Sequence, residues 1–559
     1  MLVVQRRIGV LFAVFFLLLV LAAGRTMYLG GIHSGTLRKA ARTQQLTHEV
    51  VPAQRGTITD RNGVDLAISE PAYDVSATPY QVTQALSAAQ KLAPLLGQTQ
   101  AQVLKKLSGG GGFVYLARAL PAKQARALLA LHIPGVDGTP VMRRVYPRDD
   151  LAAQVLGIVG TDGNGLAGLE YSRNKLLHGR AGERRVVSDA LGRPISITDP
   201  RSEQPGAALG LTLDANIQQR TEDVLGAVGR VFHPKDATAI VMDPRSGALL
   251  AVANWPQVNA NEPGAASQLE LQNHAVGLDY EPGSTFKAFT VSGALQGGFI
   301  TPQTSFDIPD QLQVSDRLIH DDAPHPEEML STGQILAQSS NVGAIKIGLR
   351  EGATQFSKWV DRFGFGAPTG VDLPGEERGQ VLPLKRYSGS SMGNLPIGQG
   401  ISVTPIQMAT AYAAIANGGV LRPTHLVRTV DGRPAKQPAG RRVISTATAA
   451  ALREMLKGVL APGGTASEVS IPGYTLAGKT GTANKIDPAT GQYSNSAYVA
   501  SFMGFAPAAD PKLLCAVIID EPQTGSIYGG VVAAPAFGQI MSFALPYLGI
   551  PPDSGSGGH

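Results

Sequence analysis

An unbroken apolar segment near the N-terminus constrains this chain more than any other feature of its sequence. It runs from Ile8 to Gly24, directly after Arg6 and Arg7. Its 17 residues lie at the short end of what crosses the hydrocarbon core of a bilayer as a helix. A cleaved signal peptide is the alternative, with Ala22–Gly24 as a small-residue cleavage site, but the apolar run exceeds a typical signal core. We therefore predict a transmembrane anchor within residues 1–24.

The charged residues around this segment predict its orientation. Arg6 and Arg7 favour a cytoplasmic N-terminus, although Arg25 and Lys39 on the other side weaken the charge asymmetry. A second apolar run of comparable length does not follow in the sequence. We therefore expect a single-pass protein of the cytoplasmic membrane, with the chain after about residue 25 outside the cytoplasm.

The remaining chain is too long for one hydrophobic core. Its 559 residues are 43% hydrophobic and 16% charged, which predicts a globular protein with at least two domains. The net charge of +5 is small and is not concentrated in a basic run, which argues against nucleic acid as a partner. Cys515 is the one cysteine, so internal disulfides are excluded, and its apolar neighbours predict a buried, unreactive side chain.

The first part of the exported chain, residues 25–205, predicts an elongated α+β module without catalytic residues of its own. The stretch 55–67 predicts a hairpin that turns at Asn62-Gly63. Residues 82–131 carry Ala, Leu, Gln and Lys at amphipathic spacing. They are predicted to be helical, with a break at Gly109–Gly112.

The second part, residues 206–550, predicts one larger α+β domain. A hairpin is expected over 237–254 and two further strands over 499–520, with helices between them. Strands at both ends of the segment predict one sheet that is closed by parts of the chain far apart in sequence. Residues 551–559 are rich in Gly and Ser and are predicted to be a disordered tail.

The first of three short motifs is Glu281-Pro-Gly-Ser-Thr-Phe-Lys287. Pro and Gly end the preceding loop, so a helix is predicted to begin at about Ser284. Ser284 and Lys287 then share one face of this helix. A serine hydroxyl needs a base to become a nucleophile, and a partly desolvated lysine with a lowered pKa can take its proton. Many helices contain Ser-x-x-Lys by chance, so this pair alone does not identify a site.

The second motif is Ser339-Ser340-Asn341, which follows a predicted helix. The hydroxyl of Ser339 can relay a proton from the base to a leaving amine. Asn341 can hydrogen-bond a substrate amide while it orders Lys287. When these residues are considered alone, an ordinary polar helix end explains them equally well.

The third motif is Gly478-Lys-Thr-Gly-Thr-Ala483, predicted to lie on an edge strand. Lys479 supplies a cation and Thr482 a hydroxyl, which together suit a substrate carboxylate. Gly481 lets the backbone approach the substrate closely. The same segment matches the consensus of a phosphate-binding loop. That loop requires a following helix, and residues 484–496 are too rich in Gly, Asn, Asp and Pro to form one.

The three motifs in this order are far more specific than any one of them. In them the chain resembles the superfamily of penicillin-binding proteins and serine β-lactamases. A resemblance to class B penicillin-binding proteins covers nearly the whole chain. Outside the motifs it rests on the anchor, Arg55–Gly63 with Leu66-Ala67, Gly165–Glu170, Asp243–Gly247 with Ala251–Asn254, and Gly398–Pro405. The segments Gly398–Pro405 and Ala411–Gly419 are most similar to the septal, cell-division transpeptidases.

This resemblance implies an architecture and a reaction. The architecture is an α+β chain with a single N-terminal transmembrane helix, an elongated pedestal domain at 25–205 and a penicillin-binding, serine β-lactamase-like transpeptidase domain at 206–550. The reaction is attack on the D-Ala-D-Ala bond of a peptidoglycan stem peptide, followed by transfer to an amine of a neighbouring stem. β-Lactams mimic the dipeptide and leave a slowly hydrolysed ester on the nucleophile.

The resemblance also implies a role for each motif residue. Ser284 would form the acyl-enzyme, Lys287 would be its base, Ser339 would shuttle the proton and Asn341 would position the substrate. Lys479 and Thr482 would hold the terminal carboxylate, with Thr480 and Gly481 beside them in the substrate-binding strand. The backbone N–H groups of Ser284 and Thr482 would form the oxyanion hole.

No cofactor or metal is expected. The loop His320–Glu328 contains metal-ligand residue types, among them His320, Asp321, Asp322 and His325. They flank two prolines and lack the helical i,i+4 pair of histidines, so a solvated loop is the preferred interpretation.

Several alternatives stay open at the level of sequence. A D,D-carboxypeptidase or β-lactamase shares the acylation step and differs only in how the ester is resolved. An elongation- or sporulation-specific transpeptidase carries the same motifs, and a non-catalytic division scaffold is a third possibility. A class A enzyme is excluded because residues 25–205 show no acidic catalytic pair for strand polymerisation. The expected partners are a polytopic membrane glycosyltransferase of the cell-division (FtsW-like) type and other division proteins.

Overall fold

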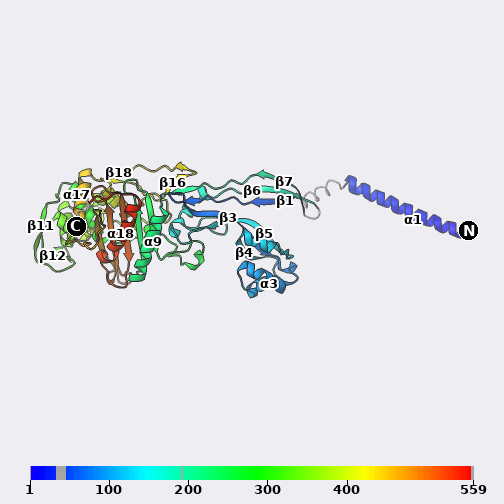
Figure 1. Cartoon of the computed structure of the whole chain (residues 1–559), viewed down its shortest axis with the longest axis horizontal. Helices are drawn as coiled ribbons and strands as arrows, with labels where there is room; N and C mark the ends of the chain where they lie inside the picture. The colour runs from blue at the N-terminus through cyan, green and yellow to red at the C-terminus, as the bar shows by residue number, and fades with distance from the viewer. Residues whose placement is uncertain (1, 33–45, 190–192, 555–559) are drawn as a thin grey trace. The chain divides into compact units, whose positions relative to one another are not determined.

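The computed structural model describes residues 2–32, 46–189 and 193–554, and its N-terminal helix carries the apolar run (Figure 1). Helix α1 spans Leu2–Met27 and leads into a short π-helical segment, η1, at Tyr28–Ile32. The window Val4–Gly31 has a mean hydropathy of 2.5, and none of it is buried inside the protein. The 26 residues of α1 rise about 39 Å, which exceeds the roughly 30 Å hydrocarbon core of a bilayer.

A second helix is also long and apolar enough to cross a membrane. This helix, α18, spans Gly529–Tyr547 and has a mean hydropathy of 1.3. It packs against strands of a sheet, where Phe537, Ile540 and Met541 are fully buried. We therefore assign α18 to the core of its domain. Within the described residues, α1 is the helix of this length whose apolar surface is uncovered.

The chain folds into two compact units, and the first comprises Met1–Gln54, Ala72–Met142 and Gly179–Gly206. It contains a three-stranded antiparallel sheet in the order β1-β6-β7 (Leu46–Val51, Gly182–Ser188 and Pro194–Arg201). It also contains a helical layer of α3, α4 and α5 (Ala85–Leu96, Gln100–Leu107 and Ala122–Leu129), preceded by η2 (Pro79–Gln81). These helices share a core with β4 (Val114–Pro121) and the end of β3 (Asp65–Ala77), to which β5 (Val136–Val145) also pairs.

Residues 82–131 are only partly helical, which corrects the expectation from the sequence. Helices α3, α4 and α5 lie in this range, but Val114–Pro121 forms strand β4. Leu116 and Leu120 are buried and Tyr115 is exposed, but Arg118 between them is exposed too, so the assignment as a strand rests on antiparallel pairing with β3. Pairing with β3 and the strand preference of Val and Tyr outweigh the amphipathic helical pattern here.

The second unit comprises Arg55–Pro71, Arg143–His178 and Ala207–His559 and is built on a five-stranded antiparallel sheet. The order is β10-β9-β21-β20-β19 (Leu249–Trp255, Asp236–Met242, Leu513–Asp520, Tyr493–Ala506 and Ala477–Ile486). The two ends of this unit thus meet in one sheet, as predicted. Helices α9 (Ala215–Phe232) and α18 lie side by side on one face (Figure 1), and α16 (Pro405–Ala416) packs on the other.

Most of the remaining helices of the second unit lie between β10 and β19 in the sequence. The longer ones are α11, α12, α13, α14 and α17 (Lys287–Gln296, Thr332–Gln338, Asn341–Glu351, Ala353–Arg362 and Thr446–Lys457). Capping boxes fix the starts of α12 and α16 through Ser331 and Thr404. Two small hairpins are inserted before α12: β11 with β14 (Ser305–Ile308 and Glu328–Ser331), and β12 with β13 (Gln311–Val314 and Arg317–His320).

The second unit also contributes strands to a second, seven-stranded sheet, which contains the predicted hairpin over 55–67. Strand β2 (Ile58–Thr59) pairs antiparallel with the start of β3, and the chain turns at Asn62-Gly63. β2 also runs parallel to β8 (Leu209–Leu211), which pairs with β16 (Val427–Val430), followed by β17 (Arg433–Pro434). Short elements complete the unit: α6, α7, α8, α10 and α15 (Ala153–Leu156, Gly168–Ser172, Asn174–Leu177, His274–Gly277 and Ser391–Asn394), η3 to η6 (Pro263–Ala265, Gly283–Phe286, Leu384–Arg386 and Leu395–Ile397), and β15 with β18 (Val420–Leu421 and Arg441–Arg442).

A buried ion pair network connects this seven-stranded sheet to α7. Glu170 is inaccessible to solvent and accepts from Nε of Arg55 (2.5 Å) and Nε of Arg144 (2.6 Å). Arg55 also donates to the Oδ1 of Asn174 (2.7 Å). Two segments that are distant in the sequence, Arg55–Gly63 and Gly165–Glu170, are therefore joined through one carboxylate.

The C-terminal part of the chain buries its cysteine and stays ordered beyond its last helix. Cys515 lies in β21 and is fully buried, and burial raises the pKa of its thiol, so it is an unreactive core residue as predicted. Asp553 accepts hydrogen bonds from the backbone N–H and the hydroxyl of Thr475. The disordered tail predicted over 551–559 therefore does not begin at 551, and residues 555–559 lie outside the described chain.

We predict that removing the charge of Glu170 destabilises the second unit. In Glu170→Gln, the guanidinium groups of Arg55 and Arg144 stay buried without a countercharge, which costs about 3–5 kcal/mol for a buried pair. Thermal unfolding followed by circular dichroism should show a clearly lower melting temperature. The control is Asp199→Asn, whose pair with Arg184 is exposed and should matter little. Equal melting temperatures for the two variants would contradict this account.

Candidate active site

The segment that carries Ser284 forms a tight turn at the start of a helix. Gly283–Phe286 is a 3-10 turn, η4, and α11 continues from Lys287, so the helix begins where it was predicted. The backbone N–H of Gly283 donates to the carbonyl of Gly398 (3.1 Å), and the hydroxyl of Tyr412 donates to the carbonyl of Thr285 (2.6 Å). Ser284 is half-buried, so a rigid turn presents it at an accessible position.

Lys287 is fully buried, and residues of the second motif hold its amine. Nζ donates to the carbonyl oxygen of Ser339 (2.5 Å), to Oδ1 of Asn341 (2.6 Å) and to the hydroxyl of Ser339 (3.3 Å). Burial lowers the pKa of Lys287 to about 8, although Asp322 and Asp321 act in the opposite direction. A useful fraction of the amine is therefore neutral near physiological pH, as a proton acceptor requires.

The second motif follows a helix, as predicted, and a second helix begins at its last residue. Ser339 ends α12 in a left-handed conformation with φ of 66°, which turns its carbonyl and hydroxyl toward Lys287. Ser340 caps α13, since its hydroxyl accepts from the N–H of Gly343 (2.9 Å). Asn341 is the first residue of α13. The structure thus brings Lys287, Ser339 and Asn341 together.

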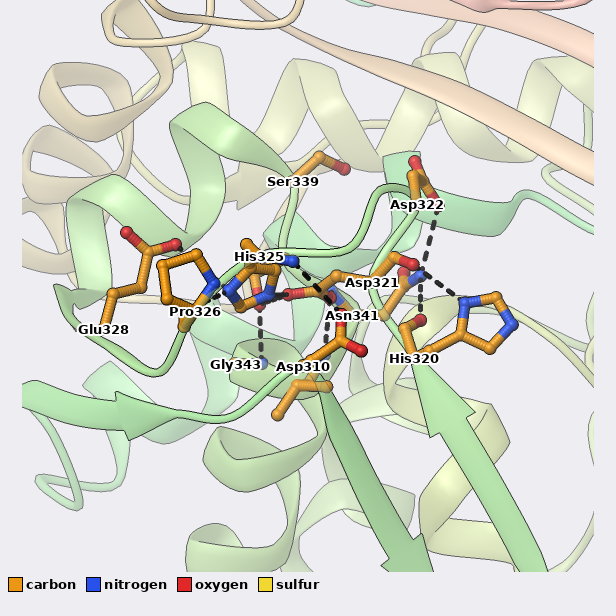
Figure 2. Close-up of polar contacts among 12 residues, drawn as sticks. Asp310, His320, Asp321, Asp322, His325, Pro326, Glu328, Ser339, Asn341 and Gly343 are labelled. Carbon is orange, nitrogen blue, oxygen red and sulfur yellow. Dashed lines mark hydrogen bonds and ion pairs between the residues drawn. The ribbon is translucent and has the colours of Figure 1, made fainter.

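A carboxylate outside the three motifs holds this turn in place (Figure 2). Asp321 accepts from the backbone N–H groups of Asn341 and Val342 and from the hydroxyl of Ser340 (2.7 Å). The first N–H groups of a helix have no partner within it, and negative charge is favourable there. The loop His320–Glu328 is largely exposed, as expected, but Asp321 turns inward and is part of the site.

The neighbours of Asp321 complete this network. The side-chain amide of Asn341 donates to the carbonyl of His320 (3.1 Å) and to Asp322 (3.3 Å). Nε2 of His325 lies 3.2 Å from Asp321. The pKa of His325 is raised, first by its hydrogen bond to the carbonyl of Pro326 and then by Asp321. These groups bind one another, and within the described chain no cluster of three or more His, Cys, Asp or Glu side chains is arranged to hold a metal.

The third motif lies on β19, the edge strand of the five-stranded sheet. Lys479 is fully buried there, and its Nζ donates to the carbonyl oxygen (3.2 Å) and the hydroxyl (3.4 Å) of Thr480. Burial lowers the pKa of Lys479, and repulsion from Lys287 lowers it further, while Asp322 opposes both. The first and third motifs therefore share one electrostatic environment. β19 continues to Ile486 as a strand, which excludes the phosphate-binding loop.

Two glycines allow the edge strand to lie against the turn that carries Ser284. A Cβ at Gly481 would come within 2.9 Å of Cγ2 of Thr285 and 2.4 Å of Oγ of Ser501. A Cβ at Gly283 would lie 3.0 Å from the Cβ of Ala483. Neither position has room for a side chain, so glycine sets the distance between strand and turn.

The two threonines of the third motif have different partners. The hydroxyl of Thr480 lies 2.7 Å from that of Thr465 and is turned away from solvent. Thr482 is half-buried, and its hydroxyl accepts from the N–H of Gly529 (3.1 Å), at the start of α18. Of the two, Thr482 keeps a hydroxyl proton available for an anionic ligand.

This arrangement suits nucleophilic attack on a carbonyl group next to a carboxylate. A serine hydroxyl lies one turn before a buried amine, a second hydroxyl contacts that amine, and the edge strand that carries Lys479 lies alongside. The sequence predicted the eight motif residues as site residues, but it did not predict the contacts of Asp321 and Tyr412 with the segments that carry them. The one signal for Asp321 was its place in an acidic loop before the second motif, and Tyr412 has no local signal at all.

Comparison with protein families places both parts of the chain. Residues 237–542 match the penicillin binding protein transpeptidase domain, and residues 50–211 match the penicillin-binding protein dimerisation domain. The probable peptidoglycan D,D-transpeptidase PenA of Neisseria meningitidis is 33% identical over 539 residues, which cover 94% of this chain and 90% of that protein. The peptidoglycan D,D-transpeptidase FtsI of Escherichia coli is 33% identical over 556 residues, covering 98% and 93% of the two chains.

Solved structures of similar proteins share the fold. Penicillin-binding protein 3 of Mycobacterium tuberculosis, in complex with aztreonam, superposes with a TM-score of 0.71 at 28% identity, covering 90% of this chain and 98% of that one. Penicillin-binding protein 2X of Streptococcus thermophilus superposes with a TM-score of 0.74 at 26% identity, covering 89% and 80%.

We predict that Gly481→Ala disturbs the site. The added methyl group overlaps Ser501 and Thr285, so β19 must move away from the turn at Ser284, and overpacking of this kind costs about 1–3 kcal/mol. The melting temperature should fall, and acylation of Ser284 by an activated ester should slow. In the control, Gly264→Ala, the new methyl group meets no atom within 4 Å, and both properties should be unchanged. Similar behaviour of the two variants would refute the close approach.

Proposed function

The chain belongs to the class B penicillin-binding proteins, and we propose that Ser284 is the nucleophile with which it carries out their reaction. It is a peptidoglycan D,D-transpeptidase, with stem peptides and β-lactams as its ligands. One observation carries the choice of nucleophile. The neutral form of Lys287 is favoured by burial, and this amine lies one helical turn after Ser284 in contact with a second hydroxyl.

The proposed acylation step uses Lys287 as the base. The amine takes the proton of Ser284, whose oxygen attacks the carbonyl carbon of the penultimate D-Ala. The tetrahedral oxyanion is held by the backbone N–H groups of Ser284 and Thr482, each worth about 3 kcal/mol in sites of this kind. The bond to the terminal D-Ala breaks, and the proton reaches the leaving amine through the hydroxyl of Ser339, which lies 3.3 Å from Lys287.

The remaining motif residues bind the substrate in this proposal. Lys479 and Thr482 hold the terminal carboxylate, with Thr480 and Gly481 forming the strand beside it. Asn341 binds the substrate amide through its side chain, which also fixes Lys287. An amine of a neighbouring stem then attacks the ester and restores the Ser284 hydroxyl. A β-lactam enters the same path but leaves an ester that resists this second attack.

We further propose the cellular setting of the enzyme. Arg6 and Arg7 favour a cytoplasmic N-terminus, so the single helix α1 would place a pedestal (25–205) and a transpeptidase domain (206–550) outside the cytoplasmic membrane. A septal role is supported by the segment Gly398–Pro405 and by the identity with FtsI across nearly the full chain. The corresponding partners are a polytopic glycosyltransferase of the FtsW-like type and other division proteins.

A fluorescent penicillin tests the nucleophile directly. The full-length wild type should carry a covalent label that survives denaturation, and Ser284→Ala should carry none, because the ester oxygen is gone. Ser305→Ala, an exposed serine on β11, is the matched control and should label like the wild type. Label on folded Ser284→Ala would show that another residue is acylated. Loss of the wild-type label within seconds would favour a hydrolase over a transpeptidase.

The pH dependence of acylation tests the base. Only the neutral amine of Lys287 accepts a proton, and its fraction rises with pH through a pKa of about 8. The second-order rate constant for acylation by a β-lactam should therefore rise roughly tenfold between pH 7 and pH 9 and then level off. The melting temperature at each pH controls for unfolding. A rate constant that is flat or falls over this range would exclude Lys287 as the base.

A further inference from the structure

A cavity of about 550 Å³ lies in the second unit, next to the end of the third motif. Its wall includes Ala483 and Asn484 of β19, which directly follow Thr482, and Tyr280 and Glu281, which shortly precede Ser284. Gly400 closes another side. The cavity therefore adjoins the active site, and both the nucleophile turn and the substrate strand contribute to it.

Glu281 is a partly buried carboxylate of this cavity, and no ion pair is formed by it within the described chain. Its Oε1 accepts from the N–H of Gly400 (3.0 Å) and from the hydroxyl of Tyr493 (3.4 Å). Its Oε2 is buried and, within the described chain, accepts no hydrogen bond. Burial raises the pKa of Glu281, against the opposing effect of Gly400 and Tyr493, so the site lacks a positive charge to stabilise the carboxylate.

The cationic side chains of the cavity are already paired with other carboxylates. Nζ of Lys485 lies 2.7 Å from Asp520 and 2.5 Å from Glu521, and Lys235 lies 3.8 Å from Glu521. Nδ1 of His274 lies 3.6 Å from Asp236. These cationic groups pair with other carboxylates, so the carboxylate of Glu281 is available to a ligand.

One other acid of the cavity is already engaged. Asp279 accepts from the hydroxyl of Ser402 (2.5 Å) and is exposed to water. The hydroxyl of Tyr280 is a second polar group of the cavity. It is buried and, like Oε2 of Glu281, has no hydrogen-bond partner among the described residues. The cavity thus offers one buried acceptor without a partner in the described chain, Oε2 of Glu281, beside cationic groups that are already paired.

The position of Glu281 fits the length of a stem peptide. Glu281 lies three positions before Ser284, so their Cα atoms are at most about 11 Å apart. A substrate acylated through its D-Ala places the preceding residue one extended step, about 3.5 Å, further along the cleft. A long amine-bearing side chain on that residue can span the remaining distance to Glu281. The amine of a second stem, which must reach the same ester, has to approach within the same radius.

We propose that this cavity binds an alkylammonium group of the stem peptide through the carboxylate of Glu281. The inference rests on the transpeptidase assignment above and extends it to the identity of the substrate side chain. An ammonium group supplies the missing charge and donates to Oε2. The ammonium can come from the acylating stem itself or from the stem that accepts the ester.

The first arm of the test examines the acylating stem. Purified full-length enzyme in detergent is given two D-Ala thioester donors that differ in one group: the preceding residue is lysine in one and Nε-acetyl-lysine in the other. If the acylating stem supplies the ammonium, the wild type prefers the lysine donor in kcat/KM by about tenfold, the factor expected for a charge-assisted hydrogen bond. In Glu281→Gln this preference should vanish. A preference is a ratio within one enzyme, so partial misfolding of the variant does not change it.

The second arm examines the accepting stem. The acyl-enzyme is formed from the acetylated donor, and an acceptor peptide with two amino groups, one neutral to attack the ester and one held by Glu281 as an ammonium, is added at several concentrations. Mass spectrometry then gives the ratio of aminolysis to hydrolysis. If the acceptor supplies the ammonium, this ratio should fall about tenfold in Glu281→Gln, because the acceptor is no longer concentrated beside the ester.

The control variant is Glu262→Gln, an exposed acid outside the cavity, which should match the wild type in both arms. The proposal is overturned if the wild type shows no donor preference and the partition ratio of Glu281→Gln is also unchanged. A donor preference that persists in Glu281→Gln overturns it as well. Failure of the transpeptidase assignment is distinguishable, because it would appear as a wild type that takes no penicillin label at Ser284.

Discussion

The desolvation of one amine is the constraint on which the rest of the site depends. Lys287 is buried between α11, α12 and α13, and three hydrogen bonds to Ser339 and Asn341 take the place of water. An ammonium group kept in water would be a poor base, and an amine buried without partners would be too costly to retain. The left-handed conformation of Ser339 and the cap at Ser340 place these three acceptors around the amine.

The same site shows why an enzyme of this kind needs a large scaffold for few catalytic groups. Each motif contributes a short turn or strand, and each is fixed by residues far away in the sequence. Tyr412 holds the carbonyl of Thr285, Asp321 holds the start of α13, and Gly529 donates to Thr482. These contacts explain how residues from three separate segments keep one geometry before any substrate arrives.

The sequence predicted the parts of this protein that have local signals. The hairpin at Asn62-Gly63, the strands of the central sheet and the three motifs follow from turn residues, apolar periodicity and short patterns. Strand β4 was mistaken for helix because its pairing with β3 is non-local. Asp321 was set aside because its partners, the N–H groups of Asn341 and Val342, become visible only when α13 is placed. The sequence likewise shows neither the cavity at Glu281 nor the ion pair of Lys485 with Asp520, which leaves Glu281 without that cation.

The position of β19 at the edge of its sheet has a consequence for how a peptide substrate is recognised. Its outer backbone groups face away from β20, so an extended peptide can lie alongside it and continue the sheet by one strand. Main-chain pairing of this kind holds a peptide by groups that every residue possesses. Such an edge recognises the shape and direction of a peptide backbone and does not depend on the peptide's side chains. Discrimination between peptides then depends on the few positions where a side chain of the peptide points away from the paired strands.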